Sequence, residues 1–347
     1  MNTRSLSFGA DRFAIALPML AAAGYPAFLL LAFKGGRLWA DGSPSLAVLS
    51  VAIGIVLAFA VPVWGFAMAL RLSAGSSPNA SQIRARSWAH LAFATPPIFT
   101  LLGVLTYMFG VDKTEVAVWV VFWAALAAML VFQRDGGPAA RRAESPGWLR
   151  FSHGVVAAVV LLGFLAMHVA NHLTGLVSAE THIAVMDVLR RWYRHPVVEP
   201  VLVVLMTFMV LSGLWLLPGK LAQRADLFQT LQTATGVYLL FYIPGHMNST
   251  FNFQRGFLGK DSDFWFASGG PLGLLMSDPW NVRLIPHYVL GVWALITHAG
   301  GGLRIMLIAH GVQERTANRM TVAISLSGAL IAIGAVLPLL RLHFGGY

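Results

Sequence analysis

The sequence predicts an all-α polytopic membrane protein with nine transmembrane helices. Two features of its composition indicate this class. Hydrophobic residues make up 57% of the chain and charged residues only 11%, so the mean hydropathy is +0.70. A soluble domain has roughly 25% charged residues, which solvate its surface. The third observation is a series of long apolar segments along the 347 residues. Lipid must therefore be the solvent for most of the chain.

Each apolar segment is long enough to cross a bilayer, which takes about 20 residues. We expect each segment to be a helix, because irregular backbone facing lipid leaves polar groups unpaired. Pro96 and Pro97 predict a kink in the third segment. In chain order, the segments are 13–33, 45–70, 88–110, 115–133, 151–173, 198–217, 229–246, 284–310 and 320–340.

Lys and Arg are slightly more frequent in the loops on the N-terminal side than in the opposite loops. This bias favours a cytoplasmic N-terminus and an outer C-terminus, in a bacterial inner membrane. The net charge of +10 is spread over short loops, so it indicates topology and lipid headgroup contact and not nucleic-acid binding. The absence of cysteine excludes disulfides, thiolate zinc sites and Cys-ligated iron–sulfur clusters.

A polar loop at 133–150 predicts two parts. Residues 1–143 would form a four-helix membrane domain without a recognisable motif, and residues 144–347 a five-helix bundle. A long outer segment at 247–283 contains Phe264-Trp265-Phe266. Its aromatic residues suit an interfacial segment or a cap over a site, and an ordinary long loop is an equally good interpretation.

Ten of the 11 histidines follow residue 150. At about 1.5 Å per residue, His168 and His246 come to similar depth near the outer ends of two parallel helices. Two imidazoles at one depth, with no carboxylate or cysteine beside them, suit axial ligation of a haem iron. The alternative is a pair of histidines that make interhelical hydrogen bonds. His172 lies one turn from His168 on the same face, so spacing leaves open which of the two is the ligand.

Five polar residues near this depth could handle the protons of a quinol, since such chemistry needs titratable groups near the headgroups. The alternative is a polar loop in water, and the loop positions of His182 and His195 favour solvent exposure. The five residues are His182, Asp187, Arg191, His195 and Glu199.

Four stretches of residues 147–341 resemble the five-helix, dihaem cytochrome b membrane anchor of succinate dehydrogenase and fumarate reductase. The stretches are Arg150-Phe-Ser-His153 with His168 fifteen residues later, Met186-Asp187 and Glu199 before an apolar run that ends at Gly213, Thr235-Gly236 with His246, and Gly291 with His298 and then Gly302-Leu303. The resemblance implies a membrane-bound cytochrome b that depends on partner subunits for its chemistry. Residues 1–143 have no counterpart in that anchor.

In that family the first and third helices bind an outer haem, and the second and fourth bind an inner one. By position, the resemblance implies that His168 and His246 hold the outer haem b and that His298 is one inner ligand. The second helix, 198–217, has no histidine, and Met209 stands near the expected position. Methionine can ligate haem iron opposite histidine. We therefore expect one firmly bound haem, with His298 either unligated or paired with Met209 around a second.

These features predict an electron-transfer cytochrome b that exchanges electrons with the quinone pool as a subunit of a larger membrane complex. A second interpretation is a non-catalytic haem-binding accessory or redox-sensing subunit. A third is a transporter with structural histidines, although the scarcity of carboxylates within the spans argues against a proton-coupled pump.

Overall fold

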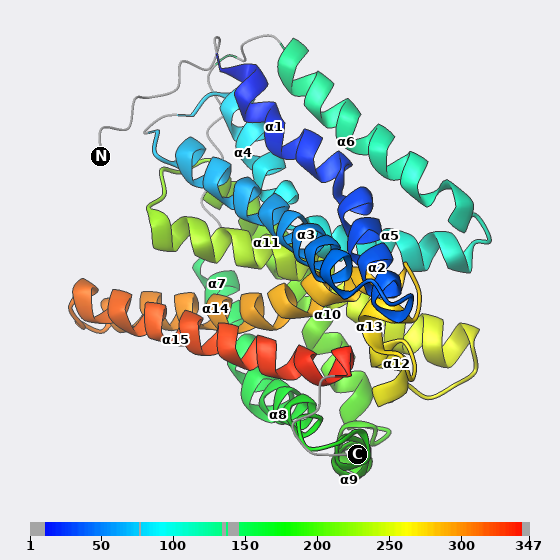
Figure 1. The fold of residues 1–347 in the computed structure, drawn as a ribbon. Helices are drawn as coiled ribbons and strands as arrows, with labels where there is room; N and C mark the ends of the chain where they lie inside the picture. Colours follow the sequence, from blue (N-terminus) through cyan, green and yellow to red (C-terminus); the bar gives the residue numbers. More distant parts are fainter. Residues whose placement is uncertain (1–10, 76–77, 134–136, 138–145, 342–347) are drawn as a thin grey trace.

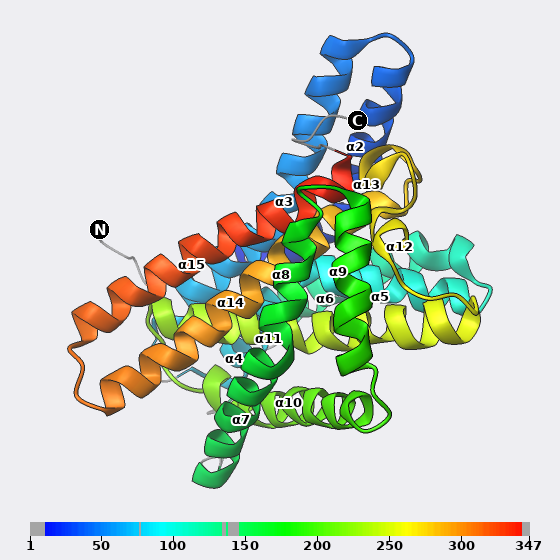
Figure 2. The same ribbon diagram turned by 90° about the horizontal axis from the view of Figure 1, so that it is seen from below.

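The computed structural model of this chain describes residues 11–75, 78–133, 137 and 146–341. Every regular element in this part of the chain is helical (Figures 1 and 2). The all-α class expected from the sequence is therefore confirmed.

The N-terminal part contains six α-helices and one short 3-10 turn. They are α1 (Arg12–Ala23), α2 (Tyr25–Ala40), α3 (Pro44–Ser73), α4 (Ala80–Phe93), α5 (Thr95–Met108), η1 (Asp112–Thr114) and α6 (Glu115–Phe132).

The C-terminal part contains the remaining helices, two of which are interrupted or extended by π-helical turns, η2 and η3. They are α7 (Gly147–Val160), η2 (Leu161–Leu165), α8 (Ala166–Thr174), α9 (Ala179–Tyr193), α10 (Val198–Leu221), α11 (Leu227–Met247), η3 (Asn248–Phe257), α12 (Phe264–Ser268), α13 (Gly273–Met276), η4 (Asn281–Arg283), α14 (Leu284–Ala309), α15 (Glu314–Val336) and η5 (Leu337–Leu340).

By length and composition, six helices in the described ranges could cross a membrane, or eight if each of two bent pairs is one span. The expected count of nine is not confirmed. The expected first segment is the pair α1 and α2, bent by 42°, and the third is the pair α4 and α5, bent by 70°. Pro96 and Pro97 lie in the first turn of α5, so the predicted kink is confirmed at the proline pair.

The segment expected at 229–246 forms α11 but is not among the candidate spans. The physical reason is its place in the fold, since α11 packs against α14, α10, α5, α4 and α3 (Figure 1). Polar residues such as Thr230 and Thr235 on this helix are completely buried. A helix surrounded by protein need not be apolar enough for lipid.

Both halves of the chain contribute to one hydrophobic core, which includes Ile15 and Trp119 as well as Phe264 and Leu284. A buried ion pair between Glu115 on α6 and Arg283 on η4 also joins the halves. The two-part organisation stays a prediction, and its boundary at 143/144 lies outside the described residues.

Two candidate spans have little protein around them. Only 6% of the residues are buried in the apolar stretches of α7–η2–α8 and of α10, against 28% to 33% in the other four unbroken spans. Among the helix pairs that lie in close contact, α7 and α8 pair with α10, α9 and α15, and not with α11 or α14. The α7–α8 rod therefore stands off from the helices that carry His246 and His298.

Candidate functional site

Three histidines, His168, His172 and His182, form a hydrogen-bonded row at the C-terminal end of the α7–α8 rod. His168 Nε2 lies 3.4 Å from His172 Nε2, and His172 Nδ1 lies 3.3 Å from His182 Nε2 on α9. The side-chain amide of Asn171 lies 3.4 Å from the same His182 nitrogen. The packing of α8 along α9 (Figure 2) brings these side chains together.

His246 on α11 faces this row. The ring centres of His168 and His246 are 6.0 Å apart. Phe164 stacks on His168 with ring centres 5.0 Å apart, and Tyr242 stacks on His246 at 5.8 Å with an interplanar angle of 9°. The two imidazoles thus meet across the space between α8 and α11, each with one face covered by an aromatic ring.

The arrangement of His168 and His246 fits a haem iron. Two axial imidazole nitrogens at about 2 Å from one metal hold the ring centres roughly 6 Å apart. Both rings are partly exposed, so protein does not enclose them completely. Within the described ranges, no group of three His, Asp or Glu side chains is placed to hold a metal ion with protein ligands alone.

The hydrogen bonds of the row define its proton positions. The Asn171 amide donates to His182 Nε2, so that nitrogen carries no proton and accepts from His172 Nδ1 as well. A neutral His172 then has its lone pair on Nε2, where it accepts from His168 Nε2 at 3.4 Å. Either imidazole could offer its Nε2 to a metal only by giving up this bond, so the choice of ligand that the sequence left open stays open.

Sequence reasoning named Gly291 but missed Tyr242, the ring that packs on it. A Cβ at Gly291 on α14 would lie 2.1 Å from the Tyr242 ring, so only glycine permits this packing. Tyr242 also contacts His287, with ring centres 4.7 Å apart. Gly291 belongs to the stretches that resemble the cytochrome b family, and this contact gives it a physical role.

His298 lies apart from the row of His168, His172 and His182, and it has other partners. Its Nδ1 is 3.0 Å from the carbonyl oxygen of Gln232, and its ring touches Gly236, where a Cβ would lie 3.0 Å from Cε1. Met209 is half-buried on α10, where its carbonyl oxygen accepts a 3.2 Å hydrogen bond from Ser212. Whether Met209 is a ligand stays a prediction.

The five predicted proton-handling residues do not form one cluster. His182 is only 3% exposed, so the expectation of a solvated side chain is wrong for it. The reason is that α9 packs along α8 and the ring lies against Phe264, with ring centres 5.4 Å apart. His195 is exposed as expected, and Asp187 and Arg191 are exposed too.

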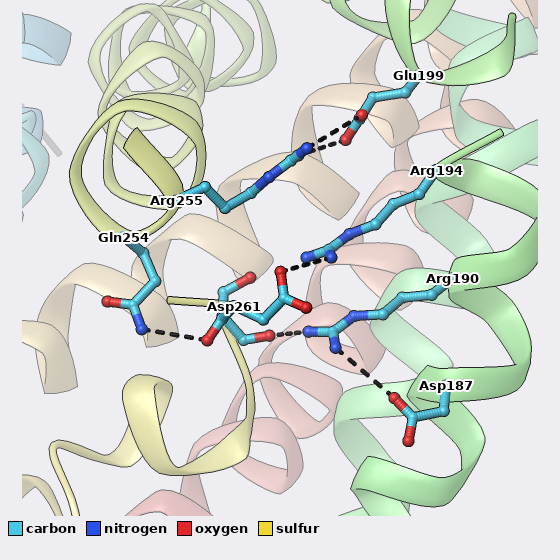
Figure 3. Close-up of polar contacts among 8 residues, drawn as sticks. Asp187, Arg190, Arg194, Glu199, Gln254, Arg255 and Asp261 are labelled. Atoms are coloured by element: carbon cyan, nitrogen blue, oxygen red, sulfur yellow. Dashed lines mark hydrogen bonds and ion pairs between the residues drawn. The ribbon is translucent and has the colours of Figure 1, made fainter. Parts of the chain in front are cut away.

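Asp187 and Glu199 instead belong to a network of ion pairs that joins α9 and α10 to the segment after α11 (Figure 3). Arg255 on η3 holds Glu199 through contacts of 2.6 and 3.4 Å, and Arg190 lies 3.6 Å from Asp187.

The same network includes Arg194, which donates a 2.8 Å hydrogen bond to Asp261 and thereby lowers the pKa of that carboxyl. Arg190 donates to the carbonyl oxygen of Ser262, and the Gln254 amide donates to that of Asp261 at 3.1 Å. The contacts of Arg190 and Arg194 reach residues 72 and 67 positions away, so they leave no local signal in the sequence. The segment at 247–283 is thus tied to α9 and covers His182 with Phe264, as the cap interpretation expects.

His182 lies outside the candidate spans, and its environment keeps it neutral. Burial, with Arg190 as a further positive neighbour, lowers its pKa to about 4, while Asp263 acts in the opposite direction. Of the five predicted residues, His182 is thus the one that belongs to the histidine row.

Comparisons of the chain with protein-family models, with curated proteins and with solved structures found no match.

Proposed function

We propose that this protein is a membrane-embedded b-type cytochrome that exchanges electrons with the quinone pool as a subunit of a larger complex. The carrying observation is the 6.0 Å separation of the His168 and His246 rings on two helices that otherwise stand apart. The proposal includes a bacterial inner membrane, a cytoplasmic N-terminus and nine spans, with α11 crossing inside the bundle.

In this function His168 and His246 hold the iron of an outer haem b, which supplies one-electron chemistry when bound. To hold the metal, His168 Nε2 would give up its 3.4 Å contact with His172. Phe164 and Tyr242 cover one face of each imidazole, and they exclude water from the ligands.

Quinone exchange is proposed at the outer end, beside His182. Because His182 Nε2 accepts from Asn171, a neutral His182 carries its proton on Nδ1. This nitrogen has no partner in the described part of the chain and can donate its proton to a quinone. Arg190 and Asp263 are the charged groups that act on this ring. Asp187 and Glu199 are paired with arginines, so we assign them to holding the outer cap in place.

The resemblance to the anchor of succinate dehydrogenase and fumarate reductase supports this function through its glycines. Gly236 lies against His298, and Gly291 accommodates the Tyr242 ring that stacks on His246. Two glycines of the resembling stretches thus contact either His298 itself or the Tyr242 ring that stacks on His246.

The absorption spectrum of the purified chain tests the proposal. Sharp bands of reduced haem b after dithionite would support it, and their absence from protein made with ample haem would leave the transporter interpretation. Reduction of the haem by a quinol without partner chains separates the electron-transfer protein from a non-catalytic accessory or redox-sensing subunit.

A further inference from the structure

Arg86 on α4 is buried where the N-terminal half of the chain meets the end of α10. Its side chain is only 1% exposed. Nη1 donates to the carbonyl oxygens of Leu221, at 3.0 Å, and Gln223, at the C-terminal end of α10 and just beyond it. The other two guanidinium nitrogens, Nε and Nη2, are also buried and have no partner in the described part of the chain. The N–H groups of these two nitrogens are therefore left without an acceptor.

Two other buried arginines show how this chain compensates such a charge elsewhere. Arg283 and Arg304 are each 6% exposed. Arg283 pairs with Glu115, and Arg304 lies 2.9 Å from a carboxylate oxygen of Glu314. The only hydrogen-bond partners of Arg86 among the described residues are backbone carbonyl oxygens. A charge removed from water without a counter-charge is strongly destabilising, so Arg86 calls for a negative group that the described residues do not supply.

His90 lies one helical turn after Arg86 on the same face of α4. Its ring is 1% exposed, and within the described ranges neither Nδ1 nor Nε2 has a partner. Side chains of a helix lean towards its N-terminus, so the His90 ring leans towards the guanidinium. A neutral imidazole carries one N–H. Arg86 and His90 therefore place unpaired N–H donors side by side on one buried stretch of α4.

The packing around this stretch limits the size of what can bind there. Ala85 and Ala89 are completely buried. Helix α3 approaches α4 so closely that a Cβ at Gly65 would lie 2.5 Å from the backbone nitrogen of Phe93. Such packing favours a single-atom anion over a phosphate or an organic carboxylate.

We propose that Arg86 and His90 bind a small inorganic anion of the size of chloride at the contact between α4 and the C-terminal end of α10. The anion accepts hydrogen bonds from Nε and Nη2 of Arg86 and from His90, and it neutralises the buried guanidinium. Because Arg86 also bonds to α10, the bound anion stabilises a contact between the two halves of the chain. This site is independent of the proposed cytochrome function.

Chloride binding to the purified full-length chain in detergent tests the proposal. Equilibrium dialysis with radioactive chloride, at an ionic strength held constant with gluconate, should give about one bound chloride per chain in the wild type. Arg86→Gln should abolish this binding. His90→Phe removes both ring nitrogens and should weaken binding by about 10- to 100-fold, the usual effect of losing one hydrogen bond to a charged group.

Arg84→Gln is the matched control. Arg84 is an exposed arginine on the same helix, and its partners are the side chains of Gln133 and Ser81. The control removes the same charge from α4 without touching the buried stretch, so it should keep the bound chloride at the affinity of the wild type.

A thermal measurement guards against a variant that fails to fold. Replacing gluconate by chloride should raise the thermal midpoint of the wild type and of Arg84→Gln, because a ligand that binds only the folded state stabilises it. Arg86→Met replaces the buried charge by an apolar side chain, a change that proteins often tolerate. Its midpoint should not respond to chloride.

Two outcomes would overturn the proposal. If the wild type binds no chloride and melts equally in chloride and gluconate, water and not an anion satisfies the nitrogens of Arg86 and His90. If one chloride stays bound in both Arg86→Gln and Arg86→Met, the anion lies at another site. Neither outcome bears on the cytochrome function, which the haem spectrum tests separately.

Discussion

The Nδ1 atom of His153 and the hydroxyl oxygen of Ser212 lie 2.7 Å apart and join α7 to α10. This bond links two spans of which only 6% is buried. The Ser212 hydroxyl donates its own proton to backbone carbonyl oxygens, so it accepts from His153 Nδ1. The bond therefore fixes the orientation of the His153 ring and leaves the lone pair of the neutral ring on Nε2.

Replacing Ser212 by Ala should weaken the contact between α7 and α10, because His153 Nδ1 loses its acceptor at 2.7 Å. We expect a loss of about 0.5–1.5 kcal/mol, the usual net contribution of one hydrogen bond, measured by unfolding in detergent. Ser212→Thr keeps a hydroxyl and should retain most of the stability. An equal loss in both variants would contradict this role of the bond.

The outer ligands can be separated by substitution. His168→Ala and His246→Ala should each abolish or shift the outer haem spectrum, whereas His172→Ala should leave a six-coordinate haem. The reason is that the His168 ring lies 6.0 Å from that of His246, while His172 is bonded to His182. Loss of six-coordination in His172→Ala alone would make His172 the ligand.

Gly291→Ala should destabilise the protein by about 1–3 kcal/mol, the usual cost of overpacking, because the new Cβ would lie 2.1 Å from the Tyr242 ring. The thermal midpoint of the detergent-solubilised protein measures this loss, and Tyr242→Leu in the same chain should recover most of it. Gly302→Ala on the same helix is the control, since its nearest neighbour atom is 3.9 Å away. Equal destabilisation by both substitutions would argue against the contact.

The two carboxylates paired with arginine should differ in their contribution to stability. Glu115 and Arg283 are 8% and 7% exposed, and breaking a buried pair costs about 3–5 kcal/mol. Glu199 and Arg255 are 24% and 32% exposed, so Glu199→Ala should cost no more than about 1 kcal/mol. Unfolding of both variants in detergent checks the difference, and added salt should weaken only the Glu199 pair.

Stability should fall in acid through His182. Because its folded pKa is lowered from 6.5 to about 4, the unfolded chain binds the extra proton between these values. The stabilising contribution is complete above pH 6.5 and declines as the pH falls towards 4, by on the order of 3 kcal/mol. The difference in unfolding free energy between wild type and His182→Gln, measured against pH, should vary in this window and be flat above pH 7.

The sequence was most informative where lipid dictates composition. Apolar runs and the Pro96-Pro97 pair sufficed for the helical class and the kink. The same reasoning failed to anticipate the burial of α11, because a helix enclosed by other helices follows protein packing and not hydropathy. Span counting by composition is therefore least secure for the central helix.

Of the candidate site, depth along straight helices sufficed to bring His168 and His246 together. Spacing could not show that His182 is buried, since this depends on α9 folding back along α8. The π-helical turn at Leu161–Leu165, which lies between His153 and His168, changes the direction of side chains in a way that regular helical periodicity omits.

The segment after α11 is tied to α9 and α10 by the ion pairs of Arg194 with Asp261 and of Arg255 with Glu199. These four side chains are between 20% and 63% exposed, so dissolved ions weaken the pairs, while the buried pair of Glu115 and Arg283 is shielded from them. The ionic strength of the surrounding medium should therefore loosen the segment that carries Phe264, while the two halves of the chain stay joined.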